Sequence, residues 1–321
     1  MTIGQAIAEA DLAMRQAKRE GKGRAVRYAP GGSVPAASSL SINEAGFNPS
    51  LSGSDVKQEI PSRSVGAAIL SGEIDFELQP ILDMTRGCII GAEALLRWRL
   101  PDGSLVPLEH YLSTFVALEW QSPFIGFLSK KRLAIIQEIR AVAPIDVHFN
   151  FVLESIQEHG QSEEVAKLLT NVKNRNEGLV VELSEKRFDN ILVPFQLGEH
   201  TVMQSSPLRT AAAQAGVKLA LDDFGTGQSN LDRLVCQPVQ LVKLDRSVCL
   251  KVVESKRARA VIRYTREICE ELDIGLIAEG IETQVQSDAL VELGVTLHQG
   301  FFHFEPMAKP DFLKLLRQQA A

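Results

Sequence analysis

The sequence lacks the features that define several large classes of protein. It contains no run of about 18 consecutive apolar residues, so we expect no helix that crosses a membrane. Its first 24 residues are charged and lack the apolar segment of a signal peptide. The four cysteines form no Cys-x-x-Cys pair, which argues against a zinc knuckle or a disulfide framework: Cys88, Cys236, Cys249 and Cys269. These absences together predict a protein of the reducing cytoplasm.

The sequence also has fewer basic than acidic residues. The 34 Lys and Arg residues face 40 Asp and Glu residues, so the net charge is −6. Because the phosphates of DNA and RNA select basic surfaces, binding of a nucleic-acid polymer by bulk attraction is excluded. Any phosphate chemistry would need local cations or metals. The apolar fraction, 45%, is that of an ordinary soluble protein, and the length allows one large domain and a smaller segment.

The chain divides into three parts. Residues 1–29 predict one amphipathic helix, a basic glycine-containing turn and a short strand, which cannot form a core alone. We therefore expect them to be the end of another domain, with a generic amphipathic helix as the alternative. Residues 30–62 are rich in Pro, Gly, Ser and Ala, a composition typical of a flexible linker. Residues 63–321 are expected to form the main domain.

Short apolar runs alternate with amphipathic stretches throughout residues 63–321. Helical patterns cover 165–172, 208–215, 258–272 and 283–293, and eight runs predict strands: 76–81, 88–96, 146–151, 179–183, 217–221, 239–244, 274–278 and 296–301. This alternation favours an α/β fold, a (β/α)8 TIM-type barrel, over an open doubly wound sheet. The link from Asp83 to Gly87 is too short for a crossover helix, so strands one and two should be antiparallel. We therefore expect a modified barrel with one antiparallel strand.

Polar residues recur at the carboxyl ends of the expected strands, where such barrels carry their active sites: Glu93, Asn150, Glu182, Asp222, Asp223, Lys243, Asp245, Glu279 and Gln299. A single acid at such a position is usually a turn former or a helix N-cap. Repetition in six consecutive units indicates one shared site instead. Clustered carboxylates repel one another unless cations are present, and oxygen ligands suit Mg²⁺ or Mn²⁺. Their number is sufficient for two metal ions bridged by one carboxylate.

The motifs that contain these residues occur in a recognisable order: Gln79-Pro80, Glu93-Ala94-Leu95, Glu182-Leu183-Ser184-Glu185, Asp222-Asp223-Phe224-Gly225-Thr226-Gly227, Lys243-Leu244-Asp245, Ala278-Glu279-Gly280-Ile281-Glu282 and Gln299-Gly300-Phe301. Over residues 66–318 this set resembles the EAL domain, the family of cyclic di-GMP phosphodiesterases. Residues 5–29 resemble the carboxyl-terminal end of GGDEF-family diguanylate cyclase domains. The signature loop of that second family is absent, so we expect no cyclase activity.

The resemblance to the EAL family implies a role for each matching residue. Glu93, Asn150, Glu182 and Asp222 correspond to ligands of a first metal ion. Asp222, Asp223 and Glu279 correspond to ligands of a second, with Asp222 as the bridge. Lys243 resembles the lysine that contacts the attacking water, so Glu93, Asp223, Lys243 and Glu279 are implied in catalysis. Gln79, Arg97 and Gln299 resemble the residues that hold the dinucleotide. Glu185 resembles the acid that braces the loop 223–229 near the family's dimer interface, which implies a homodimer.

These assignments leave alternatives open. Lys243 could simply pair with Asp222 or Glu182, and Arg97 could form a structural salt bridge instead of a phosphate contact. At the level of function, the leading hypothesis is hydrolysis of cyclic di-GMP to linear 5′-pGpG by water activated by two metal ions. A catalytically weak or silent cyclic di-GMP receptor that signals through the N-terminal module is the alternative. An unrelated metal-dependent barrel hydrolase or lyase fits the acids but not the ordered motifs.

Several residues depart from the family pattern or have a structural interpretation. Val152, Gln228 and Glu305 replace residue types that are usual in the family, and Glu305 would add an anion near a phosphate pocket. Strand alternation places His148 on the face of Asn150, deeper in the barrel, and directs His298 away from its mouth. The two tryptophans, Trp98 and Trp120, and the four cysteines are expected to pack in the core.

Overall fold

The structure is a computed structural model that describes residues 65–112, 114–115, 124–150, 178–184, 192–197, 200–205, 216–225, 234 and 239–320. The expected N-terminal segment (1–29), the linker (30–62) and the helices expected at 165–172 and 208–215 lie outside these residues.

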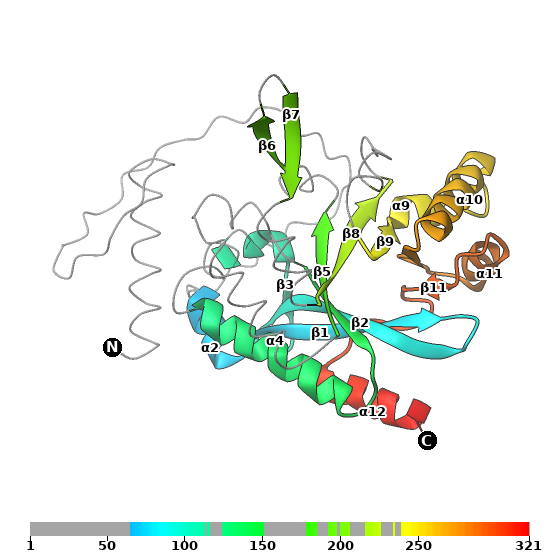
Figure 1. The fold of residues 1–321 in the computed structure, drawn as a ribbon. Coiled ribbons are helices and arrows are strands. Elements are labelled where there is room, and N and C mark those ends of the chain that lie inside the picture. Colours follow the sequence, from blue (N-terminus) through cyan, green and yellow to red (C-terminus); the bar gives the residue numbers. More distant parts are fainter. Residues whose placement is uncertain are drawn as a thin grey trace, which may run out of the picture.

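The central element is a closed, eight-stranded α/β barrel with one extra strand (Figure 1). The sheet order is β1-β11-β10-β9-β8-β5-β4-β2-β3, and pairing of β1 with β2 closes it. The strands are β1 (Ile74–Asp83), β2 (Cys88–Arg99), β3 (Leu105–Val106), β4 (Asp146–Asn150), β5 (Leu179–Ser184), β8 (Lys218–Phe224), β9 (Leu241–Leu244), β10 (Gly275–Ala278) and β11 (Leu297–His298). The predicted TIM-type barrel is therefore confirmed, and each expected strand has its counterpart in the barrel.

Strand β1 is antiparallel to both of its neighbours, β2 and β11, whereas the other barrel pairs are parallel. The cause is local. The Asp83 carboxylate accepts hydrogen bonds from the backbone N–H groups of Thr85 (2.9 Å) and Arg86 (3.2 Å), and Gly87 takes a φ of 62° that favours glycine. The chain thus reverses between the two strands without a crossover, as the short link predicted.

Helices cover the outside of the barrel: α2 (Val65–Ser71), α4 (Phe124–Arg140), α9 (Arg246–Cys249), α10 (Lys256–Glu271), α11 (Gln284–Glu292) and α12 (Lys309–Ala320), with a 3-10 turn η1 (Leu108–His110). Helices α10 and α11 start where Ser255 and Thr283 accept hydrogen bonds from the first-turn N–H groups of Ala258 and Gln286. No helix within the described ranges combines the length and apolar character needed to cross a membrane.

The connection between β5 and β8 contains an antiparallel hairpin, β6 (Leu192–Leu197) and β7 (His200–Ser205), that the sequence analysis did not predict. Within the described part of the chain the two strands pair only with each other. Pro194 lies inside the first strand, and proline weakens a strand pattern in sequence because it cannot donate a backbone hydrogen bond.

The main core lies between the outward strand faces and the covering helices. Residues such as Ile135 of α4, Ile262 of α10 and Phe312 of α12 pack there against strand residues. A second cluster lies beside α2, where the buried Trp98 ring meets Tyr111 edge-on at 5.4 Å between centroids. This agrees with the packing role expected of Trp98; Trp120 lies outside the described residues.

The cysteines of the described region behave as core residues. Cys249 and Cys269 are buried, and burial raises the pKa of each thiol to about 12. Cys88 is partly buried, and Cys236 is not among the described residues. Two of the four cysteines are therefore placed as the sequence analysis expected.

His298 is buried on the outer side of the barrel, as its position in the strand predicted. Its Nε2 lies 3.0 Å from the Val295 carbonyl oxygen, which can only accept, so Nε2 carries the proton and Nδ1 accepts from the Ser287 hydroxyl at 3.2 Å. Burial lowers the pKa of His298 to about 4. The buried ring is therefore held neutral.

This histidine should make the fold sensitive to mild acid. The folded pKa of about 4 is below the unfolded value, so the unfolded chain binds more protons, and stability falls as pH drops from about 6.5 toward 4. Between pH 7 and pH 5 we expect His298 to contribute about 2 kcal/mol to this loss. Urea unfolding of the wild type and His298→Gln at both pH values tests this. An equal acid sensitivity in the two proteins would contradict it.

Candidate functional site

The carboxyl ends of the parallel strands meet at one edge of the barrel and bring most of the predicted site residues together. Adjacent registers align Asn150 with Glu182 and Ser184 with Asp222. On the antiparallel side, Gln79 of β1 lies directly opposite Glu93 of β2, so both side chains face the barrel interior. The topology therefore gathers at one place residues that are far apart in the sequence.

Lys243 of β9 lies at the centre of this group, with an exposed fraction of 0%. Its Nζ is 2.6 Å from Glu279 Oε1, 2.8 Å from Glu182 Oε1 and 2.9 Å from Glu93 Oε2. Asp222 Oδ1 is slightly farther, at 3.6 Å. The pairing with Asp222 or Glu182 considered from the sequence is thus present, and two further acids share the same ammonium.

Glu93 is held by donors on both of its oxygens. Asn150 Nδ2 donates to Oε1 at 2.7 Å, and Gln299 Nε2 donates to Oε2 at 2.7 Å, beside Lys243. Burial would raise the pKa of Glu93, but the Lys243 ammonium and the Gln299 hydrogen bond outweigh it and hold the pKa at about 2. Glu93 is therefore the ionised partner of Lys243.

The other carboxyls of the cluster are less fully compensated. Burial raises the pKa of Glu182 and Glu279 well above the ordinary value, and the neighbouring carboxylates add to this effect while Lys243 opposes it. Burial would lower the pKa of Lys243, but the four surrounding acids hold it well above its usual range. One ammonium cannot balance the charge of four ionised carboxyls, which is why the neighbouring carboxylates raise the pKa of Glu182 and Glu279.

His148 lies below the cluster, as expected from its place in β4. Its Nδ1 is 2.9 Å from Glu182 Oε1, and both side chains are buried. Burial and the positive charge of Lys243 lower the pKa of His148 to about 3, so the ring is neutral. His148 therefore orients Glu182 from below instead of adding a charge.

Asp222 and Asp223 owe their positions to an irregularity in β8. The register between β8 and β9 shifts between Leu221 and Phe224, and Asp223 takes a φ of 57°. Such a bulge interrupts the alternation of side chains, so two consecutive acids need not point to opposite faces. Asp222 reaches toward Lys243, whereas Asp223 is exposed beside it.

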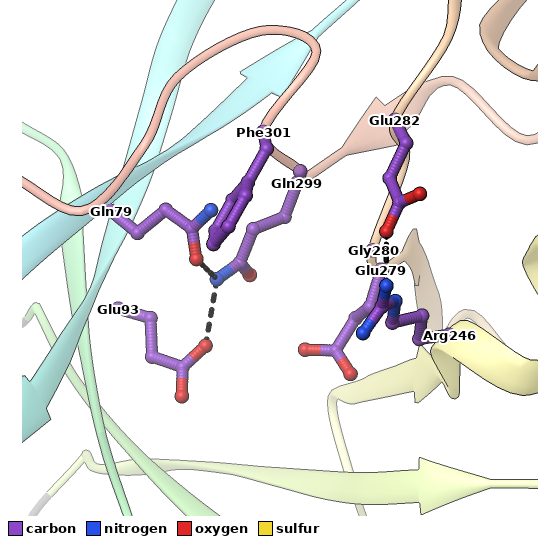
Figure 2. Close-up of a pocket in the computed structure, with 9 residues that line it drawn as sticks. Gln79, Glu93, Arg246, Glu279, Gly280, Glu282, Gln299 and Phe301 are labelled. Carbon is purple, nitrogen blue, oxygen red and sulfur yellow. Dashed lines mark hydrogen bonds and ion pairs between the residues drawn. The ribbon is translucent and has the colours of Figure 1, made fainter. Parts of the chain in front are cut away.

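A pocket of about 260 Å³ opens beside Glu93 and Glu279. Figure 2 shows the Gln299 amide between Gln79 and Glu93; Gln299 Nε2 donates to Gln79 Oε1 at 3.0 Å. Besides two glycines, three lining residues had no role in the sequence analysis: Arg246, Glu282 and Phe301. Glu282 and Phe301 belong to quoted motifs and Arg246 directly follows one, so their positions were a usable signal.

Other expected site residues lie away from this pocket. Arg97 Nε is 3.5 Å from Glu77 Oε2, and Arg97 lines a second pocket of about 390 Å³ with Asp75 and Lys131. The salt bridge considered for Arg97 is thus present. Asp245 is the N-cap of α9, where it accepts from Ser247 N at 2.8 Å, which is the structural interpretation given for an isolated acid. Glu305 is exposed. Glu185, Val152 and Gln228 lie outside the described residues.

The chemistry of the cluster suits hard divalent cations. The donors are carboxylate and amide oxygens, and two buried oxygens, Glu182 Oε2 and Asp222 Oδ1, have no hydrogen-bond partner. Across the described ranges, no three His, Cys, Asp or Glu side chains already have the spacing of a metal site. Glu93, Glu182 and Glu279 each direct one oxygen to the Lys243 ammonium.

The fold and the cluster define an α/β barrel protein with an acidic polar site at the carboxyl ends of its strands. The family model described as the EAL domain matches residues 62–306, and the chain belongs to this family. The resemblance stated from the ordered motifs is thereby confirmed. The GGDEF-like segment remains a prediction.

Known proteins agree with this assignment. The chain is 31% identical over 262 residues to the cyclic di-GMP phosphodiesterase RocR of Pseudomonas aeruginosa, covering 79% of this chain and 63% of RocR. It spans between 47% and 63% of the length of the first four curated relatives. An EAL domain protein of Listeria monocytogenes has a similar fold, with a TM-score of 0.63 at 22% identity, covering 80% of this chain and 98% of that one. The manganese and cyclic di-GMP complex of Klebsiella pneumoniae BlrP1 gives 0.57 at 22%, covering 78% and 58%.

Proposed function

We propose that this protein is a metal-dependent phosphodiesterase that hydrolyses cyclic di-GMP to linear 5′-pGpG. The observation that carries the proposal is the Lys243-centred acid cluster at the carboxyl edge of the barrel, next to a pocket that Gln79 and Gln299 line. Similar proteins support it, since RocR is named as a cyclic di-GMP phosphodiesterase and BlrP1 was solved with manganese and this dinucleotide.

In this proposal two Mg²⁺ or Mn²⁺ ions are held by six residues: Glu93, Asn150, Glu182, Asp222, Asp223 and Glu279. When bound, such ions provide a nucleophilic water at neutral pH and neutralise the charge of the phosphoryl group. Five of the six residues contribute carboxylates, and the barrel places these five on β2, β5 and β8 and directly after β10. Rigid strands hold such groups more firmly than loops do.

The other residues with a proposed role bind the dinucleotide or orient the attacking water. Lys243 contributes a positive charge to the site, within reach of a water molecule that attacks phosphorus. The amides of Gln79 and Gln299 are held by each other and by the Phe304 carbonyl oxygen, which accepts from Gln79 at 3.1 Å. They therefore have a defined orientation toward the dinucleotide. Arg97 contributes a guanidinium for phosphate after it leaves Glu77.

We extend the proposal to the setting of the enzyme. The protein acts in the cytoplasm, where cyclic di-GMP is a second messenger, and forms a homodimer through the barrel. Glu185 braces the loop that begins at Asp223 and couples the dimer interface to the metal ligands. A monomeric variant with full metal affinity and turnover would overturn this coupling.

The test is a turnover assay with purified full-length chain, cyclic di-GMP, and Mg²⁺ or Mn²⁺, with the product separated by chromatography. We expect 5′-pGpG to form, and chelation with EDTA to abolish its formation. Binding of cyclic di-GMP without any turnover would overturn the enzyme proposal and favour the receptor alternative. In that case ligand affinity should also be unaffected by chelation.

A further inference from the structure

The Lys243 side chain makes a complete set of hydrogen bonds inside the cluster. A lysine ammonium has three N–H donors, and three carboxylate oxygens lie within 2.9 Å of its Nζ, one each from Glu93, Glu182 and Glu279. The fourth acid, Asp222, is at 3.6 Å and keeps its Oδ1 without a hydrogen-bond partner. All three N–H donors of the ammonium are therefore used, whereas Glu182 and Asp222 each keep an oxygen without a hydrogen-bond partner.

Two of these three carboxylates, Glu93 and Glu182, have partners besides Lys243. Asn150 and Gln299 donate to Glu93, and His148 contacts Glu182. These contacts come from β4 and from the segment after β11, so they do not depend on Lys243. Glu93 and Glu182 therefore keep these partners when the ammonium moves away.

Lys243 and a metal ion would compete for the same carboxylate oxygens. An oxygen that accepts a short hydrogen bond from Nζ has that lone pair occupied, and the ammonium lies among the oxygens at a position a cation would take. Removing the only positive charge among buried carboxylates leaves them uncompensated, which is strongly unfavourable in a buried site. A divalent ion supplies that compensation instead.

We propose that Lys243 is the internal counter-ion of this cluster in the metal-free protein, so that metal binding must displace its ammonium from the carboxylates. Lys243 thus stabilises the fold without metal and lowers the affinity for metal. The inference rests on the proposed function only in taking this cluster as the metal site. It assigns Lys243 a role separate from any contact with the attacking water.

The experiment compares Lys243→Met with Lys218→Met. Methionine keeps an unbranched side chain and removes the charge. Lys218 of β8 pairs with Asp146 at 2.7 Å on the exposed side of the same sheet, so its variant controls for losing a lysine salt bridge. Thermal unfolding is measured in EDTA and in Mn²⁺, and Mn²⁺ affinity is measured by electron paramagnetic resonance of the free ion.

Lys243→Met should unfold at a much lower temperature than the control in EDTA, recover most of that loss in Mn²⁺, and bind Mn²⁺ at least tenfold more tightly than the wild type. An unchanged or weaker Mn²⁺ affinity in folded Lys243→Met would overturn the proposal. Neither readout requires turnover. If the wild type fails to hydrolyse cyclic di-GMP but these shifts occur, the proposed function fails and the counter-ion role stands.

A measurement on the wild type covers the case in which Lys243→Met does not fold. Lys243 is the only lysine among the described residues that is buried. Its ammonium should therefore give a slowly exchanging ¹⁵N signal. Addition of Mg²⁺ should shift this signal or remove it by faster exchange with water. A signal unaffected by saturating Mg²⁺ would show that the ammonium stays in place and would overturn the proposal.

Discussion

Replacing Glu93 by glutamine is expected to lower turnover of cyclic di-GMP by about 10³-fold while the barrel stays folded. The substitution keeps the size of the side chain. Its new amide group can still face Asn150, whose own amide can turn to accept, while the remaining oxygen accepts from Gln299 and Lys243. The hydrogen bonds therefore survive, and the loss is that of one negative charge and one metal-binding oxygen.

The measurement is steady-state kinetics in Mg²⁺ together with a thermal unfolding curve. Glu138→Gln is the matched control, because Glu138 lies on α4 and pairs with Lys309 at the surface. That control should retain wild-type turnover. If Glu93→Gln kept a tenth or more of the wild-type rate, the assignment of Glu93 as a metal ligand would be wrong.

The barrel could be predicted because its determinants are local. Each strand is a short apolar run, and the link from Asp83 to Gly87 allows nothing but a reversal. The side on which a strand residue points follows from alternation. This is why His148 could be placed deeper in the barrel, and His298 directed away from its mouth, before any contact was known.

The contacts within the site could not be predicted in the same way. A motif places Lys243 at a strand end, but its four partners come from four other strands or strand ends, so the sharing of one ammonium depends on the closure of the barrel. Arg97 shows the converse. The resemblance to the EAL family implies phosphate binding for Arg97, yet the antiparallel register places it across from Asp75 and near Glu77, which holds it in a salt bridge.

Irregular backbone explains the other features that could not be predicted from the sequence. The bulge at Asp223 and the hairpin of β6 and β7 interrupt the periods on which sequence interpretation depends. The bulge nevertheless breaks the alternation at the two consecutive acids, Asp222 and Asp223, that are proposed as metal ligands. The bulge thus lies at groups with a proposed catalytic role, as expected where function competes with local regularity.

The second large effect is expected for Gly300→Ala, because Gly300 lies against the backbone of the neighbouring segment. A Cβ atom at this position would lie 2.2 Å from the Ile281 carbonyl oxygen and 2.3 Å from its nitrogen. The two segments are also joined by hydrogen bonds, from Ile281 N to Gln299 O (3.3 Å) and from Phe302 N to Ile281 O (3.0 Å). No rotamer change relieves a contact with backbone, so the segments must separate.

We expect Gly300→Ala to lose about 3 kcal/mol of stability or more, which lowers the melting temperature by about 6 °C or more. Because Gln299 and Phe301 flank the glycine and line the pocket, KM for cyclic di-GMP should rise as well. Gly275→Ala is the control: its Cβ would meet the movable end of the Leu241 side chain at 2.7 Å, so about 1 kcal/mol is expected and turnover should persist. If Gly300→Ala lost no more stability than Gly275→Ala, the close approach of the segments after β10 and β11 would not require a glycine. Their contact would then have no part in shaping the pocket.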